Sequence, residues 1–269
     1  MKISNKVIVL TGAGSGMGRE LAIQLVNKGA KVALVDIDED TLKETAVLCR
    51  NASTSIHVLS IADQAGVNAL PEKVIAEHGQ VDAIINNAGI IQPFVDVNDL
   101  DFSVIDRVMN INFMGTVYMT KAFLPHLLKR PDAHITNVAS MGGFIPFPGQ
   151  TVYSASKAAM KTFTEGLYGE LKETNVSVTI ILPGAVDTNI MSNSGLATKE
   201  EEAKSKENNK MRGLSSDKAA AIMIKAIEGN RFRVLVGSDA RFLDFLYRLA
   251  PRFAVNFIVK QMAKYKKKS

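Results

Sequence analysis

The chain has 269 residues, of which 46% are hydrophobic and 22% are charged. This balance is that of a folded globular protein, and the length suits one large α/β domain better than two small ones. No run of about eighteen apolar residues is present, so no membrane-spanning helix is expected. The single cysteine, Cys49, excludes an internal disulfide, and with no signal peptide recognisable we expect a cytoplasmic protein.

The net charge of +5 is unevenly distributed along the chain. Residues 241–269 hold eight Lys and Arg and one Asp, whereas the remaining residues hold 24 basic and 26 acidic residues. The last segment therefore has a net charge of +7 and the main body a net charge of −2. Because a basic main body is the usual electrostatic footprint of nucleic-acid binding, no nucleic-acid partner is expected.

Short apolar runs alternate with amphipathic segments over residues 1–240. Continuous apolar runs are typical of strands buried on both faces of a parallel sheet. The alternation predicts an α/β fold, a single Rossmann-type doubly wound parallel sheet with helices on both faces. We expect strands at 7–10, 31–36, 54–60, 81–86, 133–139, 176–182 and 232–237. We expect helices at 19–28, 38–50, 64–78 (with Pro71 inside), 102–128, 153–171 and 216–228 (with Ser216 as N-cap).

A glycine-rich turn follows the first predicted strand. The sequence Thr11-Gly-Ala-Gly-Ser-Gly-Met-Gly18 stands between an apolar run and an amphipathic segment. In dinucleotide-binding proteins such a turn lets the backbone approach a pyrophosphate at a helix N-terminus. The spacing is T-G-x-x-x-G-x-G rather than G-x-G-x-x-G. Taken alone, the cluster fits an ordinary turn equally well.

Asp36 ends the second predicted strand, about twenty residues beyond the glycine-rich turn. A carboxylate at this place binds the diol of the adenosine ribose and repels a 2′-phosphate. Neither Ser15 nor Ile37 offers a cation for such a phosphate. The sequence therefore favours NAD over NADP, the alternative being that Asp36 only caps the next helix.

Tyr153 and Lys157 are four residues apart at the start of an apolar-periodic run. On a helix this spacing places both side chains on one face. A free tyrosine titrates near ~10, and a lysine cation alongside lowers the pKa of the phenol towards the working range. The pair predicts an acid/base group, although two exposed residues on a helix surface would look the same.

Ser140 and Asn112 are two further polar candidates. Ser140 follows the fifth predicted strand, and ligands bind at the carboxyl ends of strands in open α/β sheets. No acidic residue occurs between Asp132 and Glu165 and no His lies near Ser140, so a hydrogen-bonding role is favoured over a nucleophile. Asn112, inside a long apolar helix, is either a structural hydrogen-bonder or part of a site.

Taken in order, these motifs resemble the motif set of the classical short-chain dehydrogenase/reductase family. They are Thr11-Gly-x-x-x-Gly-x-Gly18, Asn86-Asn-Ala-Gly89, Asn112, Ser140, Tyr153-x-x-x-Lys157 and Pro183-Gly184. The resemblance covers about residues 5–240 and implies a catalytic domain over 1–240. It implies hydride transfer between a nicotinamide and a secondary alcohol or ketone, in a homodimer or homotetramer. Ala139 departs from the family, whose members usually carry a second serine beside the catalytic one.

The resemblance also implies a role for each residue of a tetrad formed by Asn112, Ser140, Tyr153 and Lys157. Tyr153 would be the general acid/base, and Ser140 would hydrogen-bond the reacting oxygen. Lys157 would hold the nicotinamide ribose and lower the pKa of Tyr153, while Asn112 would support Lys157 through a water. The implied cofactor contacts besides Tyr153 and Lys157 are Gly12, Ser15, Gly16, Met17 and Gly18 at the phosphates, Asp36 at the ribose, Ala62 and Asp63 at adenine, Asn87, Ala88 and Gly89 along the cofactor, and Pro183, Gly184 and Thr188 at the nicotinamide.

The segments that form substrate pockets in this family are mostly apolar here. The candidates are Phe94, Phe144, Phe147 and Met191, with Ile145, Pro146 and Ile190 beside them. No cation is placed to hold an anionic substrate, so we expect a lipophilic alcohol or ketone, the alternative being ordinary packing. Residues 193–211 are polar on all faces, which indicates a mobile lid within about 190–212 or a solvated surface helix.

Residues 241–269 form a basic amphipathic tail in which Pro251 is predicted to separate two helices. The predicted polar stripe is Arg241, Asp244, Arg248, Arg252, Asn256, Lys260 and Lys264. The predicted apolar face is Phe242, Leu243, Phe245, Leu246, Leu249, Phe253, Phe257 and Ile258. Such a tail fits packing on a partner subunit or on the enzyme's own pocket, which is favoured, or peripheral contact with an anionic membrane.

Two other functions stay open on the same fold. One is an NAD-binding epimerase or dehydratase, and the other is a nucleotide-sensing protein without turnover. The complete tetrad argues against both. No metal site is expected.

Overall fold

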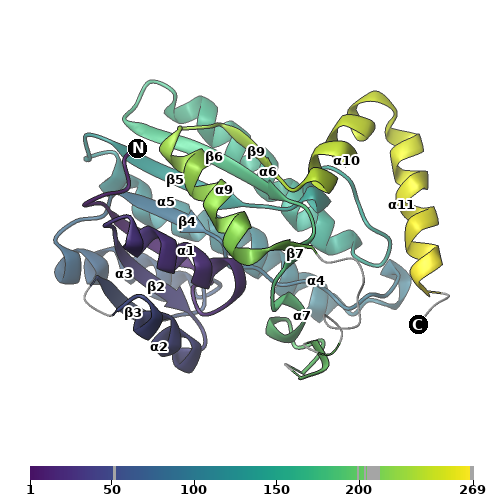
Figure 1. Cartoon of the computed structure of the whole chain (residues 1–269), viewed down its shortest axis with the longest axis horizontal. Coiled ribbons are helices and arrows are strands. Elements are labelled where there is room, and N and C mark those ends of the chain that lie inside the picture. The colour runs from purple at the N-terminus through teal and green to yellow at the C-terminus, as the bar shows by residue number, and fades with distance from the viewer. Residues whose placement is uncertain (51–52, 199, 203, 205–212, 267–269) are drawn as a thin grey trace.

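The computed structural model describes residues 1–50, 53–198, 200–202, 204 and 213–266, and the side chains of this set as far as residue 262. These residues form a seven-stranded sheet in the order β3-β2-β1-β4-β5-β6-β9, and all its strand pairs are parallel. Helices cover both faces (Figure 1). The predicted doubly wound fold is therefore confirmed.

The strands of the sheet follow the predicted apolar runs closely. They are β1 (Val7–Thr11), β2 (Lys31–Asp36), β3 (Thr54–Val58), β4 (Ala83–Asn86), β5 (Ala133–Val138), β6 (Val176–Pro183) and β9 (Arg233–Val236). The short strands β7 (Val186–Asp187) and β8 (Leu214–Ser215) form a separate pair. The helices are α1 (Gly16–Asn27), α2 (Glu39–Leu48), α3 (Gln64–His78), α4 (Phe102–Met109), α5 (Gly115–Leu127), α6 (Thr151–Leu171), α7 (Ile190–Asn193), α9 (Ser216–Glu228), α10 (Ser238–Leu249) and α11 (Pro251–Lys266).

Two apolar clusters lie on opposite faces of the sheet. Alternate side chains of a strand point to opposite faces, so Ile8 and Leu10 of β1 enter one cluster while Val7 and Val9 enter the other. The first cluster is completed by α1, α2 and α9, and the second by α3, α5 and α6. This burial on both faces is the reason that the strands are continuous apolar runs.

Strand β1 pairs with β2 on one side and with β4 on the other, so the strand order reverses direction at β1. Ligands of doubly wound sheets bind outside the carboxyl ends of the strands at such a reversal. The glycine-rich turn, Asp36 and the Asn86–Gly89 turn follow these three neighbouring strands. Ser140 and Gly184 lie just beyond β5 and β6, at the same edge of the sheet.

Three predicted helices differ from the structure in detail. The predicted helix 102–128 is interrupted, because residues Asn110–Met114 form a π-helical turn between α4 and α5. Helix α1 begins at Gly16 rather than at residue 19, so the last two glycines of the turn belong to its first turn. Helix α9 has Ser215 as its N-cap, whereas the Ser216 hydroxyl donates a hydrogen bond to the Asp187 carbonyl.

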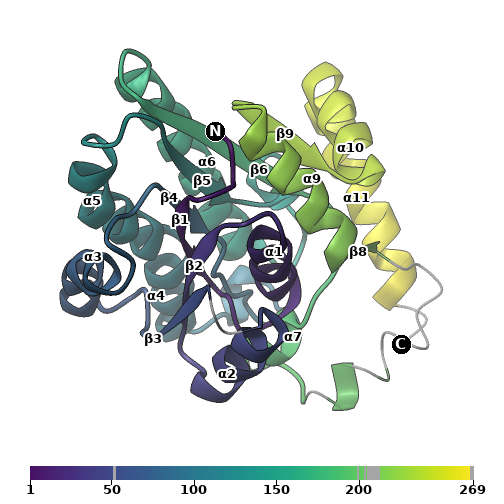
Figure 2. The same cartoon turned by 60° about the vertical axis from the view of Figure 1, so that its left-hand side comes forward.

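The tail forms two helices, α10 and α11, and Pro251 begins the second as predicted. They lie beyond the edge strand β9, at the end of the molecule away from α2 and α3 (Figures 1 and 2). Because α10 begins at Ser238, the predicted boundary between residues 240 and 241 lies inside this helix. Among the described residues, no helix is both long and apolar enough to cross a bilayer.

The amphipathic pattern of the tail is more complex than predicted. Leu243, Ala254 and Ile258 are buried in an apolar cluster with Ile145, so the tail packs on the rest of its own chain. Asp244, predicted on the polar stripe, is 8% exposed. Several residues of the predicted apolar face are instead exposed, because the helices bury only part of their apolar surface; these are Phe242, Phe245, Leu249 and Phe253.

Candidate active site

The glycine-rich turn is shaped by very close backbone contacts. Gly12 has a φ of +67°, and a Cβ atom there would lie 2.9 Å from the Cα atom of Ala88. A Cβ atom on Gly18 would lie 1.8 Å from the Gly12 carbonyl oxygen. No side chain caps α1, and its first turn carries no acidic residue. The turn and this helix end therefore fit a pyrophosphate, which would accept hydrogen bonds from the first N–H groups of the helix.

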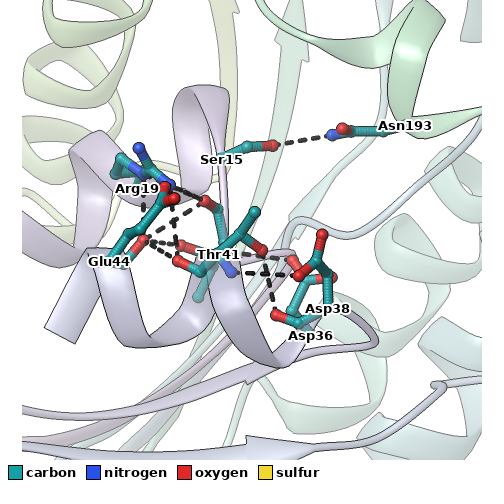
Figure 3. A network of polar contacts seen from close by, with 10 residues as sticks. Ser15, Arg19, Asp36, Asp38, Thr41, Glu44 and Asn193 are labelled. Atoms are coloured by element: carbon teal, nitrogen blue, oxygen red, sulfur yellow. Dashed lines mark hydrogen bonds and ion pairs between the residues drawn. The ribbon is translucent and has the colours of Figure 1, made fainter. Parts of the chain in front are cut away.

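Asp36 points into this turn (Figure 3). Its Oδ2 atom accepts a hydrogen bond from the Gly14 amide at 3.0 Å, and its Oδ1 atom accepts one from the Ile37 amide at 2.7 Å. The cap of α2 is Asp38, whose carboxylate accepts from the Thr41 amide at 3.1 Å. The alternative that Asp36 only caps α2 is therefore wrong, and its half-buried carboxylate keeps acceptor capacity for a ribose diol.

Arg19 is a cation beside the turn, but its guanidinium is already engaged (Figure 3). It donates to the Gly14 carbonyl at 2.7 and 3.0 Å and pairs with the Glu44 carboxylate at 2.7 Å. These contacts hold the turn against α2. They also leave the Arg19 guanidinium paired with a carboxylate.

The turn after β4 is bonded to the glycine-rich turn. The Thr11 hydroxyl accepts from the Asn87 and Ala88 amides at 3.0 and 3.1 Å, and Asn87 Nδ2 donates to the Thr11 carbonyl at 3.1 Å. The Oδ1 atom of Asn87 is buried without a hydrogen-bond partner among the described residues. A Cβ atom on Gly89 would lie 3.0 Å from Lys157 Nζ. The turn after β4 therefore lies against both the glycine-rich turn and the predicted tetrad.

Asn112 lies in the π-helical turn and joins three segments of the site. Its Oδ1 accepts from the Ile90 amide at 2.9 Å, and its Nδ2 donates to the Ile90 carbonyl at 2.9 Å and to Ser156 Oγ at 3.0 Å. The Ser156 hydroxyl in turn donates to the Tyr153 carbonyl at 2.7 Å. Asn112 thus fixes the turn after β4 against α6, and sequence reasoning had missed Ser156 as the intermediate.

Ser140, Tyr153 and Lys157 come together at the carboxyl ends of β5 and β6. Ser140 is hydrogen-bonded to Tyr153, and its hydroxyl also accepts from the Gly142 amide at 3.0 Å. Lys157 is buried and donates to the Val138 carbonyl at 3.0 Å. All four predicted tetrad residues therefore lie in one cluster of contacts, together with Gly89.

Burial governs the ionisation of the pair on α6. It raises the pKa of the Tyr153 phenol, and the hydrogen bond with Ser140 offsets only part of this rise. It lowers the pKa of Lys157 from 10.5 to about 8, so the lysine is still mostly protonated at neutral pH. The net pKa shift of Tyr153 is upward, opposite to the shift expected from the lysine alone, because the phenolate loses solvation.

Gln92 is a site residue that sequence reasoning missed. Its buried side chain accepts from the Val152 and Tyr153 amides at 2.8 and 3.0 Å, and donates to the Gly149 carbonyl at 3.0 Å. It takes the place of an N-cap side chain for α6, because Gln150 at the cap position makes no such bond. An amide placed among apolar residues just after the Asn86–Gly89 turn was the available signal.

The segment after β6 lies against the glycine-rich turn. A Cβ atom on Gly16 would lie 3.3 Å from Thr188 Cβ, and Asn193 Nδ2 donates to Ser15 Oγ at 2.8 Å (Figure 3). Further along the predicted lid, Glu202 accepts from two backbone amides of α7. Residues 199, 203 and 205–212, which make up much of the predicted lid, lie outside the described residues.

The remaining predicted contacts have mixed surroundings. Asp63, predicted at adenine beside Ala62, caps α3 by accepting from the Ala65 and Gly66 amides at 3.1 Å each. Pro183 ends β6 and is buried. Gly184 is required by close packing, since a Cβ atom there would lie 2.2 Å from Asp239 Oδ1. Asp239 also accepts from the Ala185 amide at 2.7 Å, which ties α10 to this turn.

The predicted substrate residues have different surroundings. Phe144 and Phe147 are half-buried against the tail, and Met191 is half-buried on α7. Phe94 is exposed and lies beside Gly149, close to the start of α6. Ile145 is fully buried in the tail cluster, so this residue serves packing rather than an open pocket.

A glycine-rich turn that fits a pyrophosphate, with Tyr153, Lys157 and Ser140 nearby, is the arrangement expected of an oxidoreductase that uses a nicotinamide cofactor. The profile of the family described as short chain dehydrogenase matches residues 6–199. The chain therefore belongs to the classical short-chain dehydrogenase/reductase family, as the motifs predicted, and is an enzyme that acts on CH–OH groups.

Three similar proteins illustrate this membership. A Mycobacterium tuberculosis protein named as the oxidoreductase SadH is 36% identical over 266 residues, which is 97% of this chain and 96% of SadH. A Burkholderia phymatum family member in complex with NAD has a TM-score of 0.81 and 26% identity, over 93% of this chain and 96% of its own. A Burkholderia cenocepacia short chain dehydrogenase in complex with NADP has a TM-score of 0.80 and 25% identity, over 96% and 99%. Both cofactors thus occur among similar structures.

Proposed function

We propose that this enzyme is an NAD(H)-dependent dehydrogenase/reductase of a lipophilic secondary alcohol or ketone, with Tyr153 as the general acid/base. The observation that carries the proposal is that Tyr153, Lys157, Ser140 and Asn112 share one cluster of contacts with the turn at Gly89. That turn is hydrogen-bonded to Thr11 of the glycine-rich turn, where we expect the dinucleotide to bind. A substrate held against Tyr153 would therefore be next to the cofactor.

Each side chain has a separate role in the proposed reaction. When bound, the nicotinamide accepts the hydride in oxidation and supplies it in reduction. In oxidation, Tyr153 takes the proton of the substrate hydroxyl while the carbon loses its hydride and the C=O bond forms. In reduction, Tyr153 returns that proton to the oxygen. Ser140 would hydrogen-bond the same oxygen, and the Lys157 cation would hold the nicotinamide ribose and stabilise the phenolate.

Asp36 supports the choice of NAD. Its carboxylate lies at the glycine-rich turn with acceptor capacity left for a ribose diol. The nearby Arg19 is paired with Glu44 and bonded to Gly14, which leaves little positive charge for a 2′-phosphate. A carboxylate in this position repels that phosphate.

The apolar side chains Phe94, Phe144, Phe147 and Met191 support a lipophilic substrate, and a closed homodimer or homotetramer is the expected assembly. An epimerase or dehydratase would use the same fold without net change in the cofactor. A nucleotide sensor would bind the cofactor without turnover. Net formation of NADH separates the proposed reaction from both.

The test is NADH formation by the purified protein with NAD and then NADP, against secondary alcohols graded from short-chain to steroid-sized. We expect turnover that rises with the apolar size of the alcohol and favours NAD. Tyr153→Phe removes only the hydroxyl, so we expect turnover to fall by at least ~100-fold with nearly unchanged NAD binding in a thermal-shift titration. Retained turnover in this variant would exclude Tyr153 from the role.

A further inference from the structure

Helices α10 and α11 expose several large apolar side chains. Phe245, Leu249 and Phe253 are 64%, 69% and 60% exposed, and Phe242 and Val259 are 52% and 45% exposed. On α10 the spacing of three and four residues places Phe242, Phe245 and Leu249 on one side, and Phe253 and Val259 are the exposed apolar residues of α11. We call this set, together with the cations Arg241, Arg248, Arg252 and Lys260, the outer tail face.

The opposite side of the two helices packs against the rest of the chain. Leu243, Ala254 and Ile258 are buried against Ile145, which precedes helix α6 in the chain. The rings of Phe242 and Phe257 meet edge to face at 6.2 Å and join the two helices. The buried side of the two helices therefore fixes the position of the tail beyond strand β9 (Figures 1 and 2).

The charge of the outer tail face is positive. Arg241, Arg248 and Arg252 each immediately precede an exposed apolar residue, and Lys260 follows another; all four are exposed. The one acid in residues 241–269 is Asp244. It is buried and bonded to Arg233 at 2.7 and 3.1 Å and to Arg248 at 3.1 Å, so it offsets part of the charge of these two arginines. Arg241, Arg252 and Lys260 have no acidic partner among the described residues, and they carry the positive charge of the face.

A surface hollow continues this positive charge next to α10. It is lined by Ile222, Lys225, Ala226, Arg231, Arg233, Val234, Leu235 and Arg241. Four of these described residues are cations and none is a carboxylate, although Arg233 is paired with Asp244 outside the lining. Arg241 belongs to both the hollow and the outer tail face. Exposed apolar side chains and cations together would suit a surface that is both anionic and apolar.

We propose that the outer tail face docks on an anionic membrane surface. Its phenylalanine and leucine side chains would enter the boundary between headgroups and acyl chains, while the neighbouring Arg and Lys side chains pair with lipid phosphates. A second copy of the chain fits less well, because a symmetric contact would bring two cationic faces together. Docking does not depend on the proposed reaction.

The test is flotation of the full-length protein with vesicles of phosphatidylcholine alone or mixed with phosphatidylglycerol, at low and high salt. We expect binding to the mixed vesicles, little binding to phosphatidylcholine, and weaker binding at high salt. Phe245→Ser/Leu249→Ser/Phe253→Ser should lower the partition coefficient at least tenfold. Each of Arg241→Gln, Arg252→Gln and Lys260→Gln should lower it about fivefold.

Matched controls remove similar groups elsewhere. Phe102 on α4 is 83% exposed, and Lys121 and Lys129 are exposed on or after α5. Phe102→Ser and Lys121→Gln/Lys129→Gln should leave vesicle binding unchanged. NADH formation without vesicles tests the enzyme separately, so a failure of docking and a failure of the proposed function give different results.

Two outcomes would overturn the proposal. One is that the protein fails to float with the anionic vesicles, or floats equally well after the triple substitution. The other is that the triple substitution changes the molar mass in light scattering while vesicle binding persists, which would make the outer tail face a subunit interface. Loss of vesicle binding with unchanged mass and unchanged thermal stability would support docking.

Discussion

At the scale of single residues, Asp36 and Asp38 look alike in the sequence but have different surroundings. Asp36 is bonded to the glycine-rich turn, whereas Asp38 caps α2. We predict that Asp36→Ala lowers kcat/KM with NAD by about 10- to 100-fold, since a charge-assisted hydrogen bond to the ribose is lost. It should raise kcat/KM with NADP, because the repulsion of the 2′-phosphate is also lost.

Asp38→Ala is the matched control for this prediction. It should lower the free energy of unfolding by about 1 kcal/mol through loss of the cap, with the ratio of NAD to NADP activity unchanged. Steady-state kinetics with both cofactors and urea denaturation measure the two effects. An unchanged cofactor ratio in Asp36→Ala would show that Asp36 does not select the cofactor.

Lys157 makes stability depend on pH in a defined direction. Burial lowers its pKa from 10.5 to about 8, so between these values the unfolded chain binds more protons than the folded one. Stability therefore rises with pH in this range. Above about 9 the buried Cys49 thiol opposes the rise, because burial raises its pKa from 9.0 to about 11.

We predict that the free energy of unfolding of the cofactor-free protein gains about 1 kcal/mol between pH 8 and 9 relative to Lys157→Met. The difference between the two proteins isolates this group, because their other titrating groups are the same. Urea denaturation at a series of pH values measures it. Parallel curves for the two proteins would mean that Lys157 titrates at its ordinary pKa.

At the scale of elements, the positions of the strands could be predicted from the sequence, but the contact that caps the start of α6 could not. A strand buried on both faces must be apolar throughout, so β2 was located to the residue. The π-helical turn at Asn110–Met114 changes the winding without breaking the apolar pattern, and the sequence therefore predicted one helix. Gln92 bonds to α6 across 60 residues, a contact that no local pattern contains.

The side chain of Gln92 lies at the N-terminus of α6, so we expect a charge placed there to change the pKa of Tyr153. Its Oε1 atom faces the positive end of the helix dipole, through the Val152 and Tyr153 amides. We predict that Gln92→Glu lowers kcat with little change in KM. It should also move the pH profile of alcohol oxidation upward by about one unit, because a nearby negative charge disfavours the phenolate.

Gln92→Met separates this charge effect from packing. It removes the same hydrogen bonds without adding charge, so it should lower the free energy of unfolding by about 2 kcal/mol and leave the pH profile in place. Stopped-flow or steady-state rates across pH, with denaturation curves, measure both variants. Identical pH profiles for Gln92→Glu and the parent enzyme would reduce Gln92 to a structural role.

At the scale of the whole molecule, the tail is packed against the rest of the chain and bonded to it. Asp239 at the start of α10 accepts from the Ala185 amide beside Gly184, and Phe144 packs between the sheet and the tail. The amphipathic pattern predicted two helices correctly. It did not predict which apolar residues face inward, because that depends on the three-dimensional position of Ile145 and β9.

The ion pair of Asp244 with Arg233 holds the tail on the sheet edge. Burial alone would raise the pKa of Asp244, but the hydrogen bonds and charges of Arg233 and Arg248 lower it overall. A carboxylate whose pKa is lowered on folding contributes stability above its unfolded pKa of ~3.9, and this contribution is lost as pH falls through the folded pKa. At neutral pH the contribution is complete.

We predict that Asp244→Asn lowers the free energy of unfolding by about 2–4 kcal/mol, because Arg233 is left without its carboxylate. Hydrogen exchange should speed up in α10 and α11 and stay slow in β1 and β4. Glu39→Gln, which breaks the exposed Glu39–Lys43 pair, is the control and should leave the free energy of unfolding almost unchanged, because solvent screens this pair. If exchange in α10 and α11 stayed slow in Asp244→Asn, the apolar cluster at Ile145 alone would account for the attachment of the tail.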